Sequence, residues 1–137
     1  MSLSAAQCVI LALAHQIGVE QKVPELPALI YVESRAGEYL VGDDGASFGL
    51  GHMRLSTAKD VLRAHPRLWP GKHKDHEIVI RLLKDHPWAM LLAAIRYKDV
   101  GGPAYNAGVN GAKKGRGKEY PKKIRAAQEQ VKECNDR

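Results

Sequence analysis

Apolar side chains recur along most of the chain at intervals of three and four residues, a spacing typical of amphipathic α-helices. In the first such stretch, Ser4 is a suitable N-cap for a helix that ends near Gln16, where Gly18 supplies a stop. Four further helices are expected: after Pro24 and Pro27 to about Ser34–Arg35, from the cap Ser56 through Leu62, over Ile78–Lys84 and over Trp88–Tyr97. The last helix is expected to begin near the final proline of the chain, because proline is favoured in the first helical turn. That proline is Pro121, and the apolar stripe after it consists of Ile124, Ala127, Val131 and Cys134.

Glycine and proline divide these helices. The span 37–51 holds five glycines and the pair Asp43–Asp44, which is the composition of a long loop or small hairpin. Residues 65–72 form a connection, and Gly101–Pro103 breaks the chain again. Neither an extended strand pattern nor an internal repeat occurs in the sequence. The pattern therefore predicts one compact all-α or mostly α domain over residues 1–137.

The composition fits a folded domain. Of the 137 residues, 45% are hydrophobic and 26% are charged, so the chain has enough apolar surface to form a core. Apolar runs fall well short of the roughly 20 residues that cross a bilayer, so no stable membrane insertion is expected. Residues 8–14 resemble a short signal-peptide core, but no basic residue precedes Lys22. We therefore expect a helix there rather than an export signal.

Positive charge is concentrated near the C-terminus. The net charge is +6, and the excess lies between residues 113 and 125, where seven basic residues accompany one acidic residue. These seven, here called the basic segment, are Lys113, Lys114, Arg116, Lys118, Lys122, Lys123 and Arg125. Such a segment is typical either of a solvated helix face or of a surface that binds an anionic polymer.

Few residues suggest a metal, a cofactor or a particular redox compartment. Cys8 and Cys134 are too few for a disulfide framework or a four-ligand zinc site, and they are able to pair or to stay free. The donors between His73 and Glu77 match no standard zinc spacing. The glycine-rich span 108–117 lacks the ending of a P-loop. No metal and no cofactor is therefore expected.

Glu33 is the strongest candidate for acid–base chemistry. It closes a strongly apolar helix and directly precedes the glycine-rich span. Burial against such a helix disfavours the charged form of a carboxyl and raises its pKa, as a general acid at neutral pH requires. The alternative is a surface glutamate at a helix end, where its charge opposes the helix dipole.

Three blocks in a fixed order carry a family resemblance: Glu33–Gly37 (ESRAG), Phe48–Met53 (FGLGHM) and Ala104–Gly108 (AYNAG). Together with Tyr120 before the last helix, they resemble the soluble lytic transglycosylase and goose-type lysozyme group of the lysozyme superfamily. The resemblance covers most of the chain and implies a lysozyme-like, mostly α fold. One departure is His52, which stands where the family's turn usually has glutamine.

The resemblance also implies roles for several side chains. Glu33 would protonate the glycosidic oxygen between N-acetylmuramic acid and N-acetylglucosamine, and Tyr105 would hydrogen-bond near Glu33 or the cleavage subsite. The residues expected to shape the cleft or bind the saccharide are Ser34, Phe48, Gly49, Leu50, His52, Asn106 and Tyr120. The ring of a tyrosine suits a sugar, and its hydroxyl suits a carboxyl.

Asp43 separates two reaction outcomes. A lytic transglycosylase needs one carboxyl, because the muramic 6-hydroxyl attacks the anomeric carbon and leaves a 1,6-anhydro product. A goose-type lysozyme instead positions a water with acidic residues, and the place of Asp43 six residues before Gly49 is similar to one of these. Arg54 stands where a second would be expected. Asp43 and Asp44 are equally suited to forming a turn.

The resulting expectation is a monomeric enzyme that cleaves peptidoglycan glycan strands, specifically a lytic transglycosylase. A lone catalytic domain of this kind is similar to a phage endolysin, made in the cytoplasm and active on the wall in the periplasm during host lysis. A bacterial wall-remodelling enzyme is the nearest cellular alternative. A helical nucleic-acid-binding module is the alternative from another class, supported by the basic segment. It leaves the three blocks unexplained, so no nucleic acid is expected as a partner.

Overall fold

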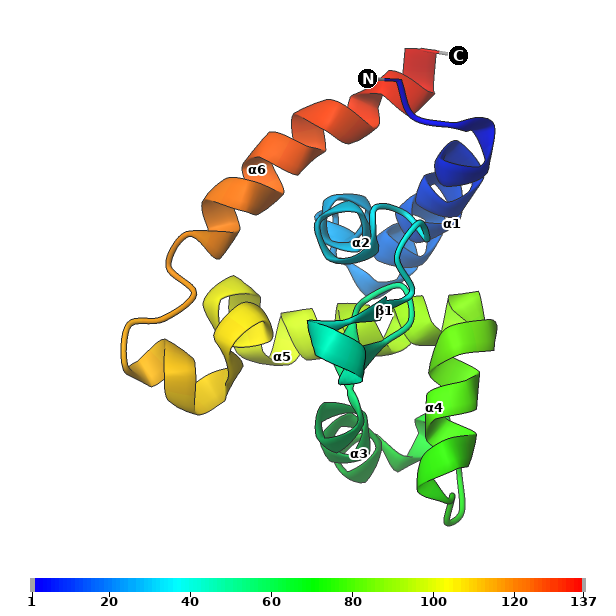
Figure 1. The fold of residues 1–137 in the computed structure, drawn as a ribbon, viewed down its shortest axis with the longest axis vertical. Helices are drawn as coiled ribbons and strands as arrows, with labels where there is room; N and C mark the ends of the chain where they lie inside the picture. The colour runs from blue at the N-terminus through cyan, green and yellow to red at the C-terminus, as the bar shows by residue number, and fades with distance from the viewer. Residues whose placement is uncertain (1, 137) are drawn as a thin grey trace.

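Helices dominate the computed structural model, which describes residues 2–136 and is 72% helical (Figure 1). The helices are α1 Ala5–Gln21, α2 Leu26–Ser34, α3 Leu55–Ala64, α4 Asp75–Lys84, α5 His86–Lys113 and α6 Tyr120–Val131. The strands are β1 Val41–Gly42, β2 Ser47–Phe48 and β3 Met53–Arg54, and the 3-10 turns are η1 Asp43–Gly45, η2 Pro66–Leu68 and η3 Lys132–Asp136. The expected compact, mostly α domain is confirmed. Within the described residues, no helix combines the length and apolarity needed to cross a membrane.

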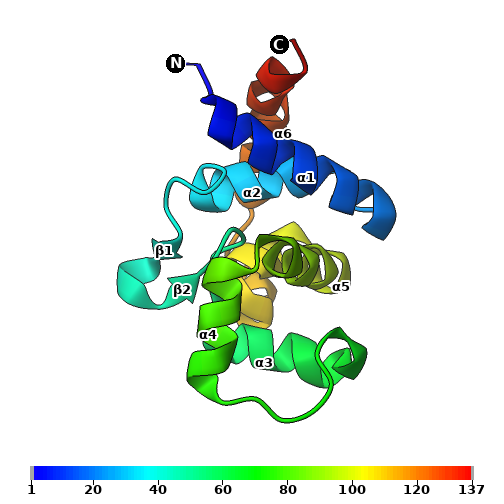
Figure 2. The ribbon, with the colours of Figure 1, turned by 90° about the vertical axis from the view of Figure 1, so that its right-hand side faces the viewer.

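Two groups of helices lie on either side of α5. One group is α1, α2 and α6, the other is α3 and α4, and α5 crosses between them (Figures 1 and 2). The side chains that α5 buries in the core with α1, α2 and α6 are Met90, Ala93 and Ala94. Those that it buries in a second core with α3 and α4 are Trp88, Ala89, Leu92 and Ile95. Both groups of helices are therefore packed on the same central helix.

The first helix begins where the sequence predicts but ends later. Ser4 is the N-cap, because its hydroxyl accepts the Gln7 N–H and the Gln7 side chain accepts the Ser4 N–H. The predicted stop at Gly18 is wrong, since the helix runs past it to Gln21, and the C-cap residue Lys22 is left-handed (φ 60°). A Cβ on Gly18 would lie 2.6 Å from the Val23 carbonyl oxygen. This glycine therefore permits a close backbone approach inside the core rather than a helix end.

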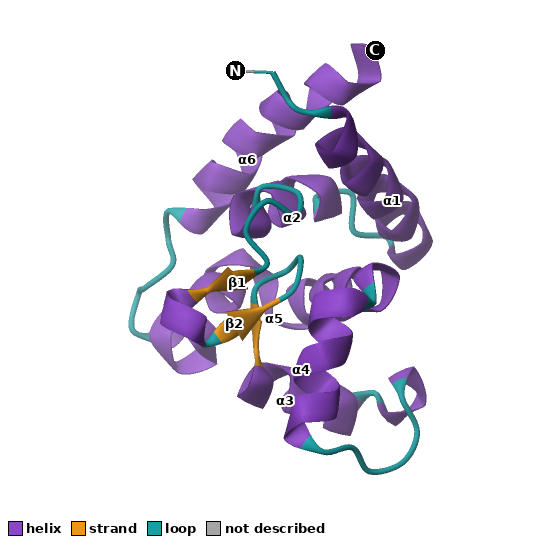
Figure 3. Cartoon of the chain, turned by 45° about the vertical axis from the view of Figure 1, so that its right-hand side comes forward, coloured by secondary structure: helices purple, strands orange, loops and turns teal. Residues whose placement is uncertain are grey.

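The glycine-rich span folds as a small hairpin, one of the two forms that the sequence left open, and a third strand extends it. β1 pairs with β2 and β2 pairs with β3, both antiparallel, so that Phe48 lies between Val41 and Met53 (Figure 3). After β2 the chain passes close to α4, where a Cβ on Gly49 would overlap the Leu82 carbonyl oxygen. This close approach anchors the hairpin to the second group of helices.

Two of the remaining helices differ from prediction in an informative way. α3 begins after the N-cap Arg54, so the expected capping by Ser56 is wrong. The strand β3 ends at Arg54, and its pairing fixes where the helix starts. The expected break after Tyr97 is present inside α5, where Gly101 (φ 82°, ψ 171°) and Gly108 (φ 78°, ψ 161°) leave the helical conformation. The backbone changes direction there (Figure 1).

The two ends of the described chain are joined. Cys8 in α1 and Cys134 in η3 form a disulfide with their Cα atoms 5.4 Å apart, which decides between the two states that the sequence left open. The Glu133 carboxylate also accepts the Leu3 N–H at 2.5 Å. Between these ties and the start of α6, Ile124 is buried against the first core, as the predicted apolar stripe requires. The last helix is thus packed along α2, and the disulfide ties the turn that follows it to α1.

Candidate active site

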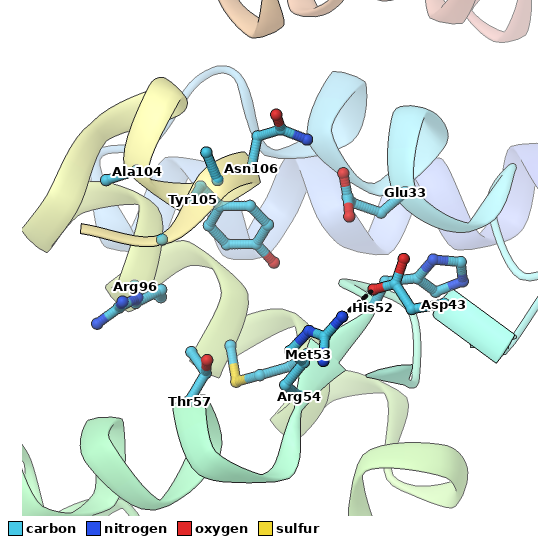
Figure 4. Close-up of a pocket in the computed structure, with 12 residues that line it drawn as sticks. Glu33, Asp43, His52, Met53, Arg54, Thr57, Arg96, Ala104, Tyr105 and Asn106 are labelled. Carbon is cyan, nitrogen blue, oxygen red and sulfur yellow. Dashed lines mark ion pairs between the residues drawn. The ribbon is translucent and has the colours of Figure 1, made fainter. Parts of the chain in front are cut away.

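A cavity of about 400 Å³ opens between the C-terminal end of α2, the small sheet, the start of α3 and the second part of α5 (Figure 4). It is lined by Glu33, Asp43, His52, Met53, Arg54, Thr57, Arg96, Ala104, Tyr105, Asn106, Ala107 and Gly108. All three sequence blocks contribute to this lining. The fold therefore gathers at one cavity residues from Glu33 to Gly108, which are 75 positions apart in the chain.

Glu33 extends into the cavity from the last turn of α2 (Figure 4). The helix before it is buried almost throughout, which fixes the position of the helix end. The Glu33 side chain is half-buried, and its Oε2 accepts a hydrogen bond from the Tyr120 hydroxyl at 2.5 Å. The other carboxyl oxygen has no hydrogen-bond partner among residues 2–136, so it is available to a ligand.

The surroundings of Glu33 favour its protonated form. Burial, reinforced by the negative charge of Asp43, raises the pKa of the Glu33 carboxyl from its usual 4.5 to about 7. The hydrogen bond from Tyr120 and the positive charge of Lys123 oppose this rise in pKa. A carboxyl with a pKa of about 7 is partly protonated at neutral pH and can donate its proton to a leaving group.

Two stacked tyrosines lie beside Glu33, of which Tyr105 lines the cavity and the predicted substrate-binding residue Tyr120 is buried behind it. Tyr120, buried at the start of α6, has its ring centroid 6.2 Å from that of Tyr105, with 24° between the ring planes. The Tyr105 hydroxyl donates to the Gly51 carbonyl oxygen at 2.8 Å. The phenol that hydrogen-bonds Glu33 is therefore Tyr120 rather than Tyr105. Burial and the charge of Glu33 raise the pKa of both phenols, so both remain hydrogen-bond donors.

Two glycines set the position of Tyr105. Gly101 interrupts α5 a few residues before the AYNAG block and redirects the chain. A Cβ on Gly51 would lie 2.7 Å from the Tyr105 hydroxyl oxygen and 2.7 Å from the Ala93 Cβ. Only a residue without a side chain therefore leaves room for this tyrosine. The next residue, Asn106, is exposed and lines the cavity.

Asp43 lines the cavity from the η1 turn, close enough to Glu33 for its charge to raise the pKa of that carboxyl. Asp43 and Asp44 both have left-handed backbones (φ 50° and 55°), so they also form the turn of the hairpin. The Oδ2 atom of Asp43 accepts the Ser47 hydroxyl and lies 3.7 Å from the Arg54 guanidinium. Its Oδ1 has no partner among residues 2–136, whereas Asp44 does not line the cavity.

His52 lines the cavity but its polar edge is engaged with the hairpin. Its Nε2 lies 2.5 Å from the Tyr39 carbonyl oxygen. A Cβ on Gly42 would lie 2.6 Å from the His52 Nδ1, so the ring packs directly on β1. The imidazole makes no hydrogen bond to Glu33. In this structure it joins the hairpin to the preceding loop.

Four of the predicted substrate-binding residues lie behind the cavity wall. Ser34 is fully buried; its hydroxyl donates to the backbone of α2 at 3.1 Å and accepts the Gly37 N–H at 3.2 Å. It therefore closes the turn that follows Glu33. Phe48 packs on the second core and Leu50 is buried in the first, while Gly49 provides the close approach to α4. These residues support the site and do not line it.

Sequence reasoning missed two polar residues of the lining, Thr57 and Arg96. Thr57 comes from the first turn of α3 and Arg96 from α5. Neither residue belongs to a local motif. The opposite wall of the cavity comes from distant segments of the chain, so the neighbouring sequence does not show that these side chains face a cavity. The one local signal is that Arg96 ends the apolar run 88–95.

Comparison of the chain with family models, with curated proteins and with solved structures finds no match. Within residues 2–136, no three side chains of His, Cys, Asp or Glu gather where they could hold a metal ion. The interpretation of the cavity therefore rests on its own side chains. A carboxyl of raised pKa beside a second carboxylate can protonate a leaving group, and the tyrosine and polar side chains of the lining can hydrogen-bond a polar ligand.

Proposed function

We propose that this protein cleaves the β-1,4 bond between N-acetylmuramic acid and N-acetylglucosamine in peptidoglycan, as a lytic transglycosylase. The observation that carries the proposal is Glu33, a half-buried carboxyl at the cavity with a pKa of about 7 and one free oxygen. The resemblance of the three blocks to the lytic transglycosylase and goose-type lysozyme group supports the same assignment, because every block contributes to the cavity lining.

In the proposed reaction, protonated Glu33 donates its proton to the glycosidic oxygen as the bond from that oxygen to the muramic anomeric carbon breaks. The muramic 6-hydroxyl then forms a bond to the anomeric carbon and gives its proton to the Glu33 carboxylate. The products are a free 4-hydroxyl on one fragment and a 1,6-anhydro ring on the other, and no water is consumed. Tyr120 orients the carboxyl through Oε2 and leaves the other oxygen to face the sugar.

Hydrolysis is the second candidate, and the observation that favours it is Asp43. This carboxylate lines the same cavity, and one of its oxygens has no partner in the described part of the chain, as a base that positions water requires. The other oxygen is engaged by Ser47 and faces Arg54. Because Glu33 alone suffices for the intramolecular reaction, we favour the transglycosylase. Replacement Asp43→Asn should then leave product formation intact, whereas a hydrolase would lose it.

The anionic bacterial cell wall as a binding partner is part of the same proposal. The basic segment begins at the end of α5 and continues into α6, and its Lys123 is close enough to affect Glu33 electrostatically. Such a field attracts an anionic polymer and weakens with added salt. We place the activity in the periplasm during phage-induced lysis, a setting that rests on the family resemblance.

The test is digestion of purified peptidoglycan with the wild type and with Glu33→Gln. The variant keeps the shape of the side chain but has no proton to donate, so the rate of soluble fragment release should fall roughly 10²- to 10⁴-fold. Glu38→Gln is the matched control, because Glu38 is exposed and does not line the cavity. Equal rates for the wild type and Glu33→Gln would contradict the proposal, as would no release by the wild type.

A further inference from the structure

Arg96 is a cation at the cavity that has no side-chain or backbone partner within the described residues 2–136. Its side chain is half-buried on α5 and lines the cavity, across from Glu33 and Asp43 in Figure 4. Burial and Glu33 raise the pKa of Tyr105 while the charge of Arg96 opposes the rise, so this charge acts on the same wall. Among residues 2–136, its guanidinium has neither a hydrogen bond nor an ion pair.

The charges around Arg96 are not balanced within the cavity. The two acidic residues of the lining are Glu33, which is partly neutral at pH 7, and Asp43. Asp43 lies 3.7 Å from Arg54, so these two opposite charges offset each other. That leaves Arg96 as an uncompensated positive charge with five N–H donors in a planar fork. A partly desolvated guanidinium of this kind is matched best by a carboxylate, which accepts two parallel hydrogen bonds.

We infer that Arg96 binds a carboxylate of the substrate and thereby selects acidic glycan strands over neutral ones. The inference rests on the proposed function and names the substrate feature that the same cavity recognises. Thr57 also lines the cavity, and its hydroxyl is a further hydrogen-bond donor there (Figure 4). Arg96 acts by binding and orientation, since a guanidinium stays charged across the working pH range and transfers no proton.

A muramic acid unit offers a carboxylate in two ways. Where its peptide has been removed, the lactyl group ends in a free carboxylate. Where the peptide is attached, that carboxyl is an amide, and the free carboxylates belong to the peptide. Chitin, a neutral polymer of N-acetylglucosamine, has neither. The shared chemistry is a carboxylate carried on the muramic side of the strand, and substrates that differ only in this group separate the two sources.

The experiment measures binding to the inactive Glu33→Gln protein, so that no glycan is cleaved. Calorimetry or fluorescence titration compares three oligosaccharides of equal length: peptide-free with lactyl carboxylates, peptide-free with these converted to neutral methylamides, and peptide-bearing. Each is titrated against Glu33→Gln alone and with Arg96→Gln, Arg96→Lys or Arg67→Gln added. Arg67 is the matched control, because it is exposed in η2 and lies outside the cavity lining.

We expect Arg96→Gln to weaken binding of a carboxylate-bearing glycan about tenfold or more, the usual effect of losing a charge-assisted hydrogen bond. Binding of the methylamide glycan should not change, and neither should any affinity in Arg67→Gln. Arg96→Lys should recover part of the loss, because it keeps the charge but not the fork. A loss limited to the peptide-free strand identifies the lactyl carboxylate, and a loss limited to the peptide-bearing strand identifies the peptide.

Two results would overturn the inference. One is unchanged affinity of Arg96→Gln for both acidic glycans, and the other is an equal loss for the acidic and the methylamide glycans, which would indicate a structural role. In both cases the proposed function stands if the wild type still cleaves peptidoglycan and Glu33→Gln does not. If the wild type neither cleaves nor binds any of the glycans, the proposed function fails and the inference falls with it.

Discussion

At the scale of single residues, opposing influences on Glu33 set its chemistry. Burial and Asp43 raise the pKa of its carboxyl, whereas the Tyr120 hydroxyl and Lys123 lower it, and the balance is about 7. The carboxyl is therefore poised near neutrality, where a general acid is most effective. Apart from burial, each influence belongs to one side chain, so single substitutions can test it.

The pH dependence of the rate should report the balance at Glu33. Because Glu33 must be protonated to act, kcat/KM should fall as the pH rises through about 7. Tyr120→Phe removes a hydrogen bond that lowers the pKa of Glu33, so the falling limb should move to higher pH. The measurement is a pH–rate profile on solubilised glycan strands. Tyr105→Phe is the control, because the Tyr105 hydroxyl donates to Gly51 and not to Glu33, and it should leave the midpoint in place. A shift of the Tyr120→Phe midpoint to lower pH would refute this account.

Glu33 should also make stability depend on pH. In the unfolded chain its carboxyl titrates near 4.5, and in the folded protein near 7. The contribution of this carboxyl to the free energy of unfolding is therefore fully present below pH 4.5 and is lost as the pH rises through 7. Glu33→Gln does not titrate, so its stability relative to the wild type should be greater at pH 8 than at pH 4. Urea unfolding at both pH values measures this difference, and an equal difference at the two would contradict the raised pKa.

At the scale of elements, the hairpin between α2 and α3 depends on glycines that serve different purposes. Gly49 has a left-handed backbone (φ 82°) and no room for a side chain beside Leu82. Gly45 is also left-handed (φ 93°), but nothing lies within 4 Å of where its Cβ would stand. Substituting each of these two glycines therefore separates the energetic cost of backbone strain from that of a steric clash.

Alanine at these two glycines should have unequal effects. Gly45→Ala should lower the free energy of unfolding by about 1 kcal/mol, the typical cost of a left-handed backbone for a residue with a Cβ. Gly49→Ala adds a clash with the backbone of α4 and should lower it by roughly 3 kcal/mol or more. Chemical denaturation of both variants provides the comparison. Equal losses would show that the hairpin moves freely away from α4.

Local chemistry in the sequence predicted most of the elements. Ser4 marks the start of α1 because a capping side chain acts within one turn, and the break at Gly101 follows from backbone freedom. The failures have a common cause, since Gly18 and Ser56 were interpreted from neighbours in sequence alone. Gly18 serves a close approach to Val23, and the pairing of β3 decides where α3 begins. Tertiary contacts of this kind have no local sequence signal.

At the scale of the whole molecule, the site depends on contacts between distant parts of the chain. Tyr120 and Glu33 are 87 positions apart, and their hydrogen bond forms only because α6 packs along α2. The sequence singled out Glu33 by its place at the end of an apolar helix, and Tyr120 through the family resemblance, but it could not show their contact. Arg96 was missed for a related reason, because the second part of α5 must turn before the cavity exists.

The disulfide is the covalent link that holds the last helix in this arrangement. It joins residues 126 positions apart, and closing so long a loop restricts the unfolded chain strongly. Replacing both cysteines by serine should lower the free energy of unfolding by about 2–5 kcal/mol. Denaturant unfolding of the variant, and of the wild type with and without reductant, tests this. Identical unfolding curves with and without reductant would mean that packing of α6 alone holds the two ends together.

The most direct test of the central claim is the mass of the fragments released from purified peptidoglycan. Glu33 acting with the muramic 6-hydroxyl predicts products with 1,6-anhydro ends, each lighter by one water than the hydrolysed fragment and without a reducing end. Asp43→Asn should release the same products, and Glu33→Gln should release almost none. Reducing muramic ends that disappear in Asp43→Asn would instead establish hydrolysis with Asp43 as the base. Unchanged release by Glu33→Gln would contradict the assignment of Glu33 as the acid.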